Sequence, residues 1–579
     1  MYGEVRPVIV KTISMRWGRT AIQVAAAFAV VLVIIYFNQR LTLSLRPLEV
    51  KITHLTDVSK ENTREVQGSQ SSNLDKVAVV VAMDKVETAE IIKHKSQAAL
   101  MVNVPFFKTL LHSFCLTASL GFEYNFYIGF LHTDEDFKKS GQMLIESFVQ
   151  TMNHSCLHSV KATLVFAAVP NFENKAMAVI DTMRLAFMQN NNYFYLVDSK
   201  MKMESKRWTE NFTEMLSKSR PAANLGIVLP SVASIDAKSP IPFSFVHRRH
   251  FDIFGLFYLF EARKYGDWWL KQVYDNKYFV NPEVKVSCEK STITVAIPAG
   301  AELDAMNAVV KSSKHLIDRW VEGAQVKPNA NRVISFSLYG DSPRYAFGAI
   351  RNAQLARLFL PQWTARFYVV GKGTKYPTPG EGTVQHLKRL GAEILTLDAG
   401  TVNKLAPMLW RFLPGDDSRL EAYIVRDTDS RLSEREANLI QEWMTADTAF
   451  HCIRDHPSHG NYAISGGLFG GKPKKLKKLL DHSWGEMMAG YGAGYIQDMN
   501  FLNAVIWPKV KTDSLCHDSV SCIKYPKTAP IVAPRDKYFH IGAVFNEYDQ
   551  MRQGDVNILK NAGVNKACTN LEMFKQKQG

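Results

Sequence analysis

The chain has 579 residues, 46% of them hydrophobic and 22% charged, with a formal net charge of +15. This is the composition of an ordinary globular protein, but the length excludes a single core and indicates two domains with additional segments. The positive charge suits a nucleic acid, a membrane surface or an anionic substrate. The basic residues are scattered and no nucleic-acid-binding motif is present, so we expect no nucleic-acid partner.

The N-terminal region has the pattern of a signal anchor. Residues 1–20 carry four basic side chains and one acid, and residues 21–37 are apolar apart from Gln23. The run is at the short end for a membrane helix, which needs about 20 residues. No small-residue cleavage site follows it, which disfavours the alternative of a cleaved signal peptide. The basic residues predict a cytosolic tail at 1–20, a transmembrane anchor at 21–37 and a lumenal remainder, which begins with a flexible stem at 38–75.

Residues 76–281 form the first predicted domain. Apolar runs typical of buried strands alternate with helical patterns, which indicates a mainly parallel sheet. The predicted strands are 77–82, 125–130, 162–169 and 193–197, and the predicted helices are 106–119 and 172–189. Two sequons, at Asn153 and Asn211, are expected to carry glycans in a lumenal domain.

Residues 282–331 are expected to connect this domain to a second one at 332–559, and 560–579 to form a frayed tail. The connector carries a helical pattern at 301–321. The predicted strands of the second domain are 333–338, 365–370, 393–397 and 422–425, with helices between them. The predicted fold class is α/β, with two tandem, mainly parallel sheets behind one N-terminal transmembrane helix, as if one fold were used twice.

Two carboxylates, Asp427 and Asp429, follow the last of these strands. The carboxyl end of a parallel strand is where an α/β sheet presents its ligands, and two acids there can hold one hard cation together with diphosphate oxygens. Ser433 and Glu436 form a capping-box pattern that opens a helix at 434–444. The alternative is a solvated turn, because aspartate and serine are common turn formers.

Several motifs occur in order around this acidic turn, and together they resemble GT-A glycosyltransferases, in which Asp-x-Asp holds a metal and a nucleotide-sugar. The motifs are the segments at 334–340, 348–353, 410–413, 464–471 and 497–498. The resemblance implies GT-A-like, Rossmann-like domains, a Mn²⁺ or Mg²⁺ ion, a UDP- or GDP-sugar donor and a glycan or glycoprotein acceptor. It also implies a single-pass type II protein of the Golgi membrane with its catalytic part in the lumen.

The resemblance implies roles for the acidic and imidazole side chains. Asp429 would coordinate the metal, and Asp427 would contact the metal or the ribose. His540 would be a third metal ligand, because residues 538–542 are similar to the His-x-x-Gly element of glycogenin-like enzymes, with one residue fewer between His and Gly. Asp498 matches an acid beside the reacting carbon. As a general base it would make the reaction inverting, and the stereochemistry stays open.

Five further residues are candidates for contact with the donor. Gly340 ends the first strand of the second domain, where backbone can approach a base or ribose. Gly466 and Gly467 would let the donor sugar lie against backbone. Arg411 can reach a phosphate with its planar fork or form a structural salt bridge. Arg431 has the same two interpretations.

The first domain resembles the same enzymes in a degenerate form. Its strand at 193–197 ends in Asp198, but Lys200 stands where the second acid is expected. An ammonium group competes with a metal for the carboxylate. Residues 268–272 also lack the expected acids. We therefore expect a scaffold or glycan-binding domain here and catalysis in the second domain.

Seven cysteines are present, and none has the spacing of a zinc site. Cys516 and Cys522 enclose a short polar loop and are predicted to pair in an oxidising lumen. The pairing of the remaining five stays open: Cys115, Cys156, Cys288, Cys452 and Cys568.

The predicted function is thus metal-dependent glycosyl transfer from a nucleotide-sugar in the secretory pathway. The alternative is a non-catalytic lumenal glycan-binding or scaffolding protein with both domains degenerate. A metal-dependent phosphohydrolase also uses paired acids, but the ordered motifs do not suggest it. The donor sugar, the acceptor and the linkage stay open.

Overall fold

The computed structural model describes residues 74–562 and Cys568, except residues 132–134, 157–159, 170–174, 233–241, 289–294, 493, 495 and 534. The predicted cytosolic tail, anchor and nearly all of the stem lie outside these residues. Within them, no single helix is both long and apolar enough to span a membrane. One pair bent by 73°, Gln97–Asn103 with Phe106–Thr117, has the required length and composition. Its larger apolar side chains, such as Leu110 and Phe114, lie in the core.

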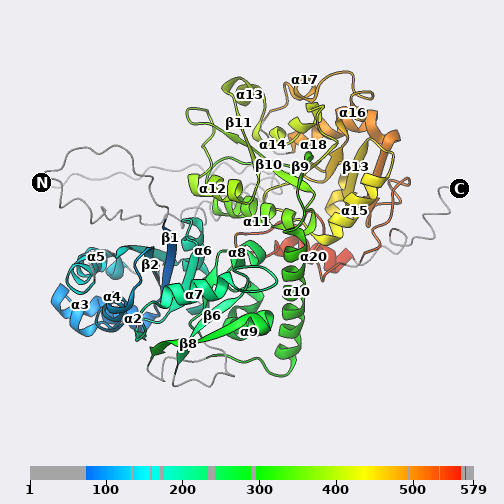
Figure 1. Cartoon of the computed structure of the whole chain (residues 1–579). Helices are drawn as coiled ribbons and strands as arrows, with labels where there is room; N and C mark the ends of the chain where they lie inside the picture. The colour runs from blue at the N-terminus through cyan, green and yellow to red at the C-terminus, as the bar shows by residue number, and fades with distance from the viewer. Residues whose placement is uncertain are drawn as a thin grey trace, which may run out of the picture. The chain divides into compact units, whose positions relative to one another are not determined.

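The first domain alternates strands and helices (Figure 1). Its strands are β1 Asp75–Ala82, β2 Phe122–Leu131, β3 Lys161–Val169, β4 Tyr193–Val197, β5 Lys202–Met203, β6 Ile227–Val232, β7 Phe245–His247 and β8 Tyr278–Ser287. Its helices are α2 Lys85–Lys93, α3 Gln97–Asn103, η1 Phe106–Leu111, α4 His112–Thr117, α5 Glu135–Ser155, α6 Lys175–Met188, α7 Trp208–Ser217, α8 Arg249–Phe254, η2 Phe260–Tyr265, α9 Gly266–Tyr274 and η3 Asp275–Lys277. The strands pair in the order β3-β2-β1-β4-β7-β6-β8-β5.

Helix α10, Ala301–Gly323, leads to the second domain. Its strands are β9 Asn329–Ser337, β10 Trp363–Val370, β11 Glu393–Leu397, β12 Ala422–Val425, β13 Phe450–Arg454, β14 Phe469–Gly471 and β15 Ser514–Asp518, paired in the order β11-β10-β9-β12-β14-β13-β15. The helices are α11 Pro343–Phe359, α12 Glu381–Arg389, α13 Ala399–Lys404, α14 Pro407–Trp410, η5 Leu413–Asp416, α15 Glu434–Thr445, η6 Pro457–Asn461, α16 Pro473–Leu476, α17 Trp484–Met488, α18 Gln497–Phe501, η7 Leu502–Ile506, α19 Trp507–Val510, η8 Lys511–Asp513 and α20 Gln553–Ala562.

The two sheets have the same topology. If β1 to β4 are matched with β9 to β12, and β6, β7 and β8 with β13, β14 and β15, the two strand orders coincide. The pairing directions coincide too, since β7 and β14 are antiparallel to both of their neighbours and the other matched pairs are parallel. The prediction of an α/β protein with two mainly parallel sheets is confirmed, and one strand plan is used twice.

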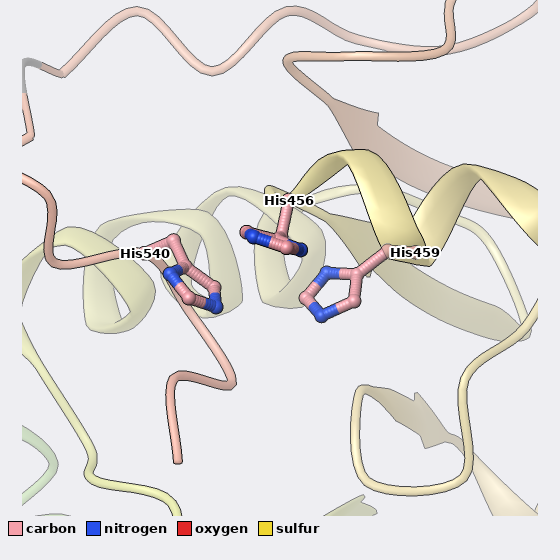
Figure 2. A group of neighbouring side chains, drawn as sticks. All are labelled: His456, His459 and His540. Atoms are coloured by element: carbon pink, nitrogen blue, oxygen red, sulfur yellow. The ribbon is translucent and has the colours of Figure 1, made fainter. Parts of the chain in front are cut away.

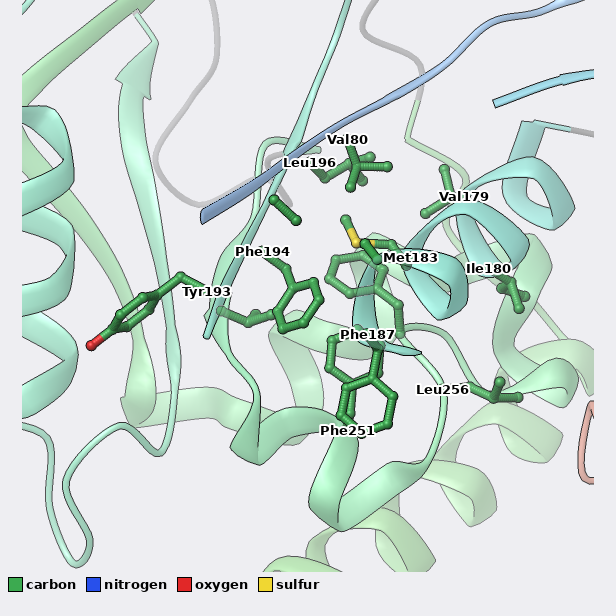
Figure 3. Close-up of a cluster of buried hydrophobic side chains, with 14 of the residues drawn as sticks. Val80, Val179, Ile180, Met183, Phe187, Tyr193, Phe194, Leu196, Phe251 and Leu256 are labelled. Atoms are coloured by element: carbon green, nitrogen blue, oxygen red, sulfur yellow. The ribbon is translucent and has the colours of Figure 1, made fainter. Parts of the chain in front are cut away.

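Central parallel strands are buried on both faces, which explains their continuous apolar runs. Val77 to Val81 in β1 are at most 1% exposed. Helix α6 packs on the first sheet through Met183 and Phe187, and Phe187 stacks on Phe251 with ring centroids 4.9 Å apart (Figure 3). This packing fixes the strand ends, where the candidate sites lie.

Some boundaries differ from the predicted ones. β8 pairs with β6 in the first sheet and continues to Ser287, inside the segment predicted as a connector. The helix expected at 301–321 is present as α10, and β9 begins at Asn329. At the C-terminus α20 runs to Ala562, so the predicted tail at 560–579 begins within a helix. Strand β8 extends into the predicted connector because it pairs with the distant strand β6.

The predicted Cys516–Cys522 disulfide is wrong. The structure pairs Cys452 with Cys516 and Cys522 with Cys568. Cys452 and Cys516 are direct partners on the parallel strands β13 and β15, with Cα atoms 4.5 Å apart. Strand register therefore decided this pairing. A third disulfide, Cys115–Cys156, joins α4 to the segment after α5.

Candidate active site

The acidic turn after β12 is held by hydrogen bonds of its own. Ser430 donates its backbone N–H (3.2 Å) and its hydroxyl (2.8 Å) to the carbonyl of Asp427. Ser433 caps α15 by accepting from the Glu436 N–H at 3.3 Å, as predicted. The Glu436 carboxylate pairs with buried Arg426 instead of closing the capping box. The turn is therefore tied to both the strand and the helix.

A second support comes from α11, which packs directly against this turn. Asn352 donates to the carbonyls of Thr428 (3.1 Å) and Ser430 (2.8 Å) and accepts from the Leu432 N–H at 3.2 Å. A Cβ at Gly348 would lie 2.1 Å from the Thr428 carbonyl oxygen, so only glycine permits this approach. Residues 348–353 of α11 thus hold the turn that carries Asp427 and Asp429 in place.

A cavity of about 860 Å³ opens at the carboxyl end of β12. Most predicted site residues line it, namely Gly340, Arg411, Asp427, Asp429, Gly466, Gly467 and Asp498, whereas His540 and Arg431 do not. Its charged lining consists of four acids and two arginines: Asp341, Asp427, Asp429, Asp498, Arg411 and Arg552. The cavity is therefore acidic, which suits a divalent cation.

Arg411 joins two of these acids. It contacts Asp427, and its Nη2 lies 2.9 Å from Asp498 Oδ2. Burial opposes its charge, but the two carboxylates outweigh burial and raise the pKa of Arg411. Of the two interpretations of Arg411, the salt bridge is the one observed in this structure. Because Arg411 lines the cavity, its guanidinium can also reach a phosphate there.

Asp429 has a different partner. Arg344, in the first turn of α11, contacts its carboxylate. Burial raises the pKa of Asp429, and the charge of Asp427 raises it further. Burial also raises the pKa of Asp498. Acids that repel one another in this way favour a cation between them. Sequence reasoning missed Arg344, although its place just after the first strand, at the same sheet edge, was an available signal.

Gly466 and Gly467 carry the backbone directly over the acids. A Cβ at Gly466 would lie 2.2 Å from Asp498 Oδ2, and one at Gly467 would lie 2.0 Å from Asp427 Oδ2. A side chain at either position would therefore have to displace one of these carboxylates. The two glycines therefore close one wall of the cavity against the carboxylates.

His540 lies with two other histidines, His456 and His459, and one ring nitrogen from each falls within 4.8 Å of the others (Figure 2). His540 stacks on His456 with ring centroids 4.4 Å apart. Burial lowers the pKa of His540 to about 4 and that of His459 to about 3. All three imidazoles are therefore neutral near pH 7, as metal ligands must be.

Hydrogen bonds within the protein already occupy ring nitrogens of His456 and His459. His456 accepts from the Ser458 N–H at Nδ1 (3.2 Å) and donates from Nε2 to the Asp555 carbonyl (3.2 Å). His459 accepts at Nδ1 from the Asp455 N–H (3.3 Å), which places its proton on Nε2. Of these three histidines, only His540 keeps a lone pair, on Nε2, to which no described residue donates. His540 is the candidate imidazole ligand of the three.

The segment after His540 reaches the acidic turn, since the Phe545 N–H donates to the Asp429 carbonyl at 2.8 Å. Arg431 is part of the same support. It pairs with Asp549 at 2.6 Å and donates to the carbonyls of Ser430 and Asn546. Of its two interpretations, the structural salt bridge is the one present here.

No protein-family model and no curated protein matches the chain. Among solved structures, the crystal structure of S. aureus TarS is similar over 49% of this chain and 49% of that chain, with 10% sequence identity and a TM-score of 0.24. The aligned region spans about half of either protein. At this TM-score the likeness supports no conclusion about fold or activity, and the function proposed next rests on the geometry of the site.

Proposed function

We propose that the second domain is a metal-dependent glycosyltransferase that takes its sugar from a nucleotide-sugar donor. The observation that supports this most is the convergence of Asp427, Asp429 and Asp498 with Arg411 in one cavity, walled by backbone glycines. Three segments distant in sequence supply these groups at the carboxyl end of a parallel strand, where α/β sheets bind ligands.

The donor set suits a hard divalent cation such as Mn²⁺ or Mg²⁺. Asp427 and Asp429 offer carboxylate oxygens, and His540, which has an unused ring nitrogen but does not line the cavity, is proposed as the third ligand. The mutual repulsion of the two acids supports this assignment. When bound, the ion would neutralise the charge that develops on the leaving diphosphate. The arginines that now contact the two acids, Arg344 and Arg411, would then be released toward phosphate oxygens.

Asp498 is proposed to orient the acceptor hydroxyl and to accept its proton. Its carboxylate lies in the cavity beside Gly466, where the donor sugar is expected. Burial raises its pKa and so strengthens it as a base, while the pair with Arg411 keeps it ionised. A base at this position would give an inverting reaction. The donor would be a UDP- or GDP-sugar, and the acceptor a glycan or glycoprotein.

We also propose a single-pass type II arrangement in the Golgi membrane, with residues 21–37 as the anchor. Asn153 is exposed near the end of α5, whereas Asn211 is half-buried in α7. Glycosidase treatment of the protein expressed in a eukaryotic cell should increase its electrophoretic mobility. An unglycosylated protein, or one cleaved after residue 37, would contradict this topology.

The test of the activity is a donor-hydrolysis screen of the purified protein with UDP- and GDP-sugars and Mn²⁺. Turnover of one donor, abolished by a chelator, is the expected result. The matched control is Asp447→Asn, which removes an exposed acid of an ion pair outside the cavity. Binding of glycans without turnover of any donor would instead support a non-catalytic lumenal binding protein.

A further inference from the structure

The first domain contains a cavity at the place that corresponds to the active-site cavity of the second. It has a volume of about 320 Å³ and opens at the carboxyl end of β4, the strand that matches β12. Asp198, the first residue after β4, lines it, and in the second domain Asp427 follows β12 at nearly the same position. The duplicated strand plan thus duplicates the cavity.

The acid that matches Asp498 is also present. Asp498 is the second residue of α18, which lies in the chain between β14 and β15. Asp267 is the second residue of α9, which lies between the matching strands β7 and β8, and it too lines its cavity. Residues 268–272 were predicted to lack an acid, and Asp267 lies directly before them. Tyr258 donates to Asp267 at 2.7 Å.

A cation contacts the first of the two acids in both cavities. In the second domain Arg411, from the segment before β12, joins Asp427 to Asp498. In the first domain Lys175, from the segment before β4, lies 3.0 Å from Asp198, and its charge also acts on Asp267. The second oxygen of Asp198 accepts from the Lys200 N–H at 3.0 Å. The first domain therefore keeps a cation beside its first acid and a second acid in the same cavity, whereas Lys200 replaces the counterpart of Asp429.

The balance of charge is reversed between the two cavities. Within the part of the chain that the structure describes, the charged lining of the first has two acids and three cations, Asp198, Asp267, Lys175, Arg263 and Lys264, whereas that of the second has four acids and two arginines. Lys264 pairs with Glu302. Among the described residues no carboxylate pairs with Arg263, which donates only to the Phe260 carbonyl, at 2.7 Å. The first cavity therefore lacks the excess of carboxylates that suits a divalent cation, and Arg263 is the cation that is available to an anion.

We propose that the first-domain cavity is a second ligand site, which binds the phosphate of an anionic ligand through Arg263 and Lys175 without a divalent cation. Tyr265 and Phe243 in its lining offer apolar faces to a sugar or base. The choice of phosphate rests on the proposed function of the second domain, because the two cavities occupy matching places. The phosphate can come from a nucleoside diphosphate or from a phosphorylated sugar.

The test is calorimetric binding to the purified full chain in EDTA, which removes metal-dependent binding at the second site. The probes are UDP, GDP, glucose 1-phosphate, mannose 6-phosphate and inorganic phosphate. Lys175→Ala and Arg263→Gln should each weaken binding at least tenfold. The control Lys311→Ala, on an exposed face of α10, should not. Asp429→Asn should also leave this binding unchanged, because Asp429 lies in the other cavity.

The two ligand sources give different results. Binding of UDP or GDP that depends on Lys175 and Arg263 identifies a nucleotide site, and the same dependence for sugar phosphates alone identifies a phosphorylated-saccharide site. Absence of phosphate binding in EDTA, or binding that both variants leave unchanged, would overturn the proposal. Mn²⁺-dependent turnover by the same variants is the control for folding. It also separates failure of this proposal from failure of the proposed enzyme.

Discussion

Asp429 and Asp198 follow matching strands but are expected to respond differently to the same substitution. Asp429→Asn keeps the size of the side chain and removes a charged metal ligand. Loss of roughly 4 kcal/mol of transition-state stabilisation would lower turnover about a thousandfold. Asp198→Asn should leave turnover within a few fold, because Asp198 lies in the first-domain cavity. Donor turnover at saturating Mn²⁺ measures both, on material of equal melting temperature. The opposite pattern would place the active site in the first domain.

Arg344 is expected to compete with the metal for Asp429, because it contacts that carboxylate directly. Arg344→Gln should lower the Mn²⁺ concentration for half-maximal binding by roughly three- to tenfold, which corresponds to about 0.7–1.4 kcal/mol. Turnover should fall, since a phosphate contact is lost as well. Titration of Mn²⁺ followed by electron paramagnetic resonance separates these effects. Arg332→Gln, which breaks a pair with Glu421 at the opposite strand end, is the control. Weaker Mn²⁺ binding by Arg344→Gln would exclude the competition.

At the scale of elements, the disulfide between β13 and β15 fixes the edge of the second sheet. Replacing Cys452 and Cys516 together by serine should lower the free energy of unfolding by about 2–4 kcal/mol. The main reason is that the unfolded chain gains conformational freedom when the cross-link is removed. Urea unfolding measures the loss. Non-reducing peptide mapping should recover Cys452 linked to Cys516 and Cys522 linked to Cys568. A peptide that links Cys516 to Cys522 would show that this register is wrong.

Asp267, the second residue of helix α9, should make the stability of the protein depend on pH through its titration. Burial raises the pKa of Asp267 to about 6, against the hydrogen bond from Tyr258 and the charge of Lys175, which lower it. The folded state therefore holds this proton more tightly than the unfolded state. The stability that Asp267 contributes is complete below its unfolded pKa of 3.8 and is lost as pH rises through about 6.

Asp267→Asn removes this dependence. The stability of the variant relative to the unmodified protein should rise between pH 4 and 7 by an amount on the order of 3 kcal/mol, since the pKa differs by about two units. Urea unfolding at several pH values gives the difference. A difference that does not change with pH would mean that Asp267 titrates normally in the folded protein.

One hydrophobic core cluster joins the two sheets, since it contains Val79 of β1 as well as Ile334 of β9. Phe187 of the first domain lies 4.4 Å, between ring centroids, from His386 of the second. Arg351 of α11 donates to the Ile253 carbonyl at 3.0 Å. We therefore expect the two domains to unfold together, in one calorimetric transition. Two resolved transitions in a scan at neutral pH would show that they are independent.

The sequence by itself determined the local elements and the acidic strand ends. The strands predicted at 193–197 and 422–425 match β4 and β12, because short apolar runs between turn residues have few other ways to be buried. The start of α15 at Ser433 followed from side-chain capping, which is equally local. Three-residue β14 was not predicted, since its glycines form a strand only by pairing with β12 and β13.

The tertiary structure decided which of these local features meet. The pairing of Cys452 with Cys516, the contact of Arg344 with Asp429 and the place of Lys175 beside Asp198 all join residues far apart in the chain. Such contacts depend on strand order and register, which no local pattern encodes. For the same reason the sequence predicted acids able to hold a metal in the second domain, whereas only the fold showed that the first keeps a matching cavity with the opposite balance of charge.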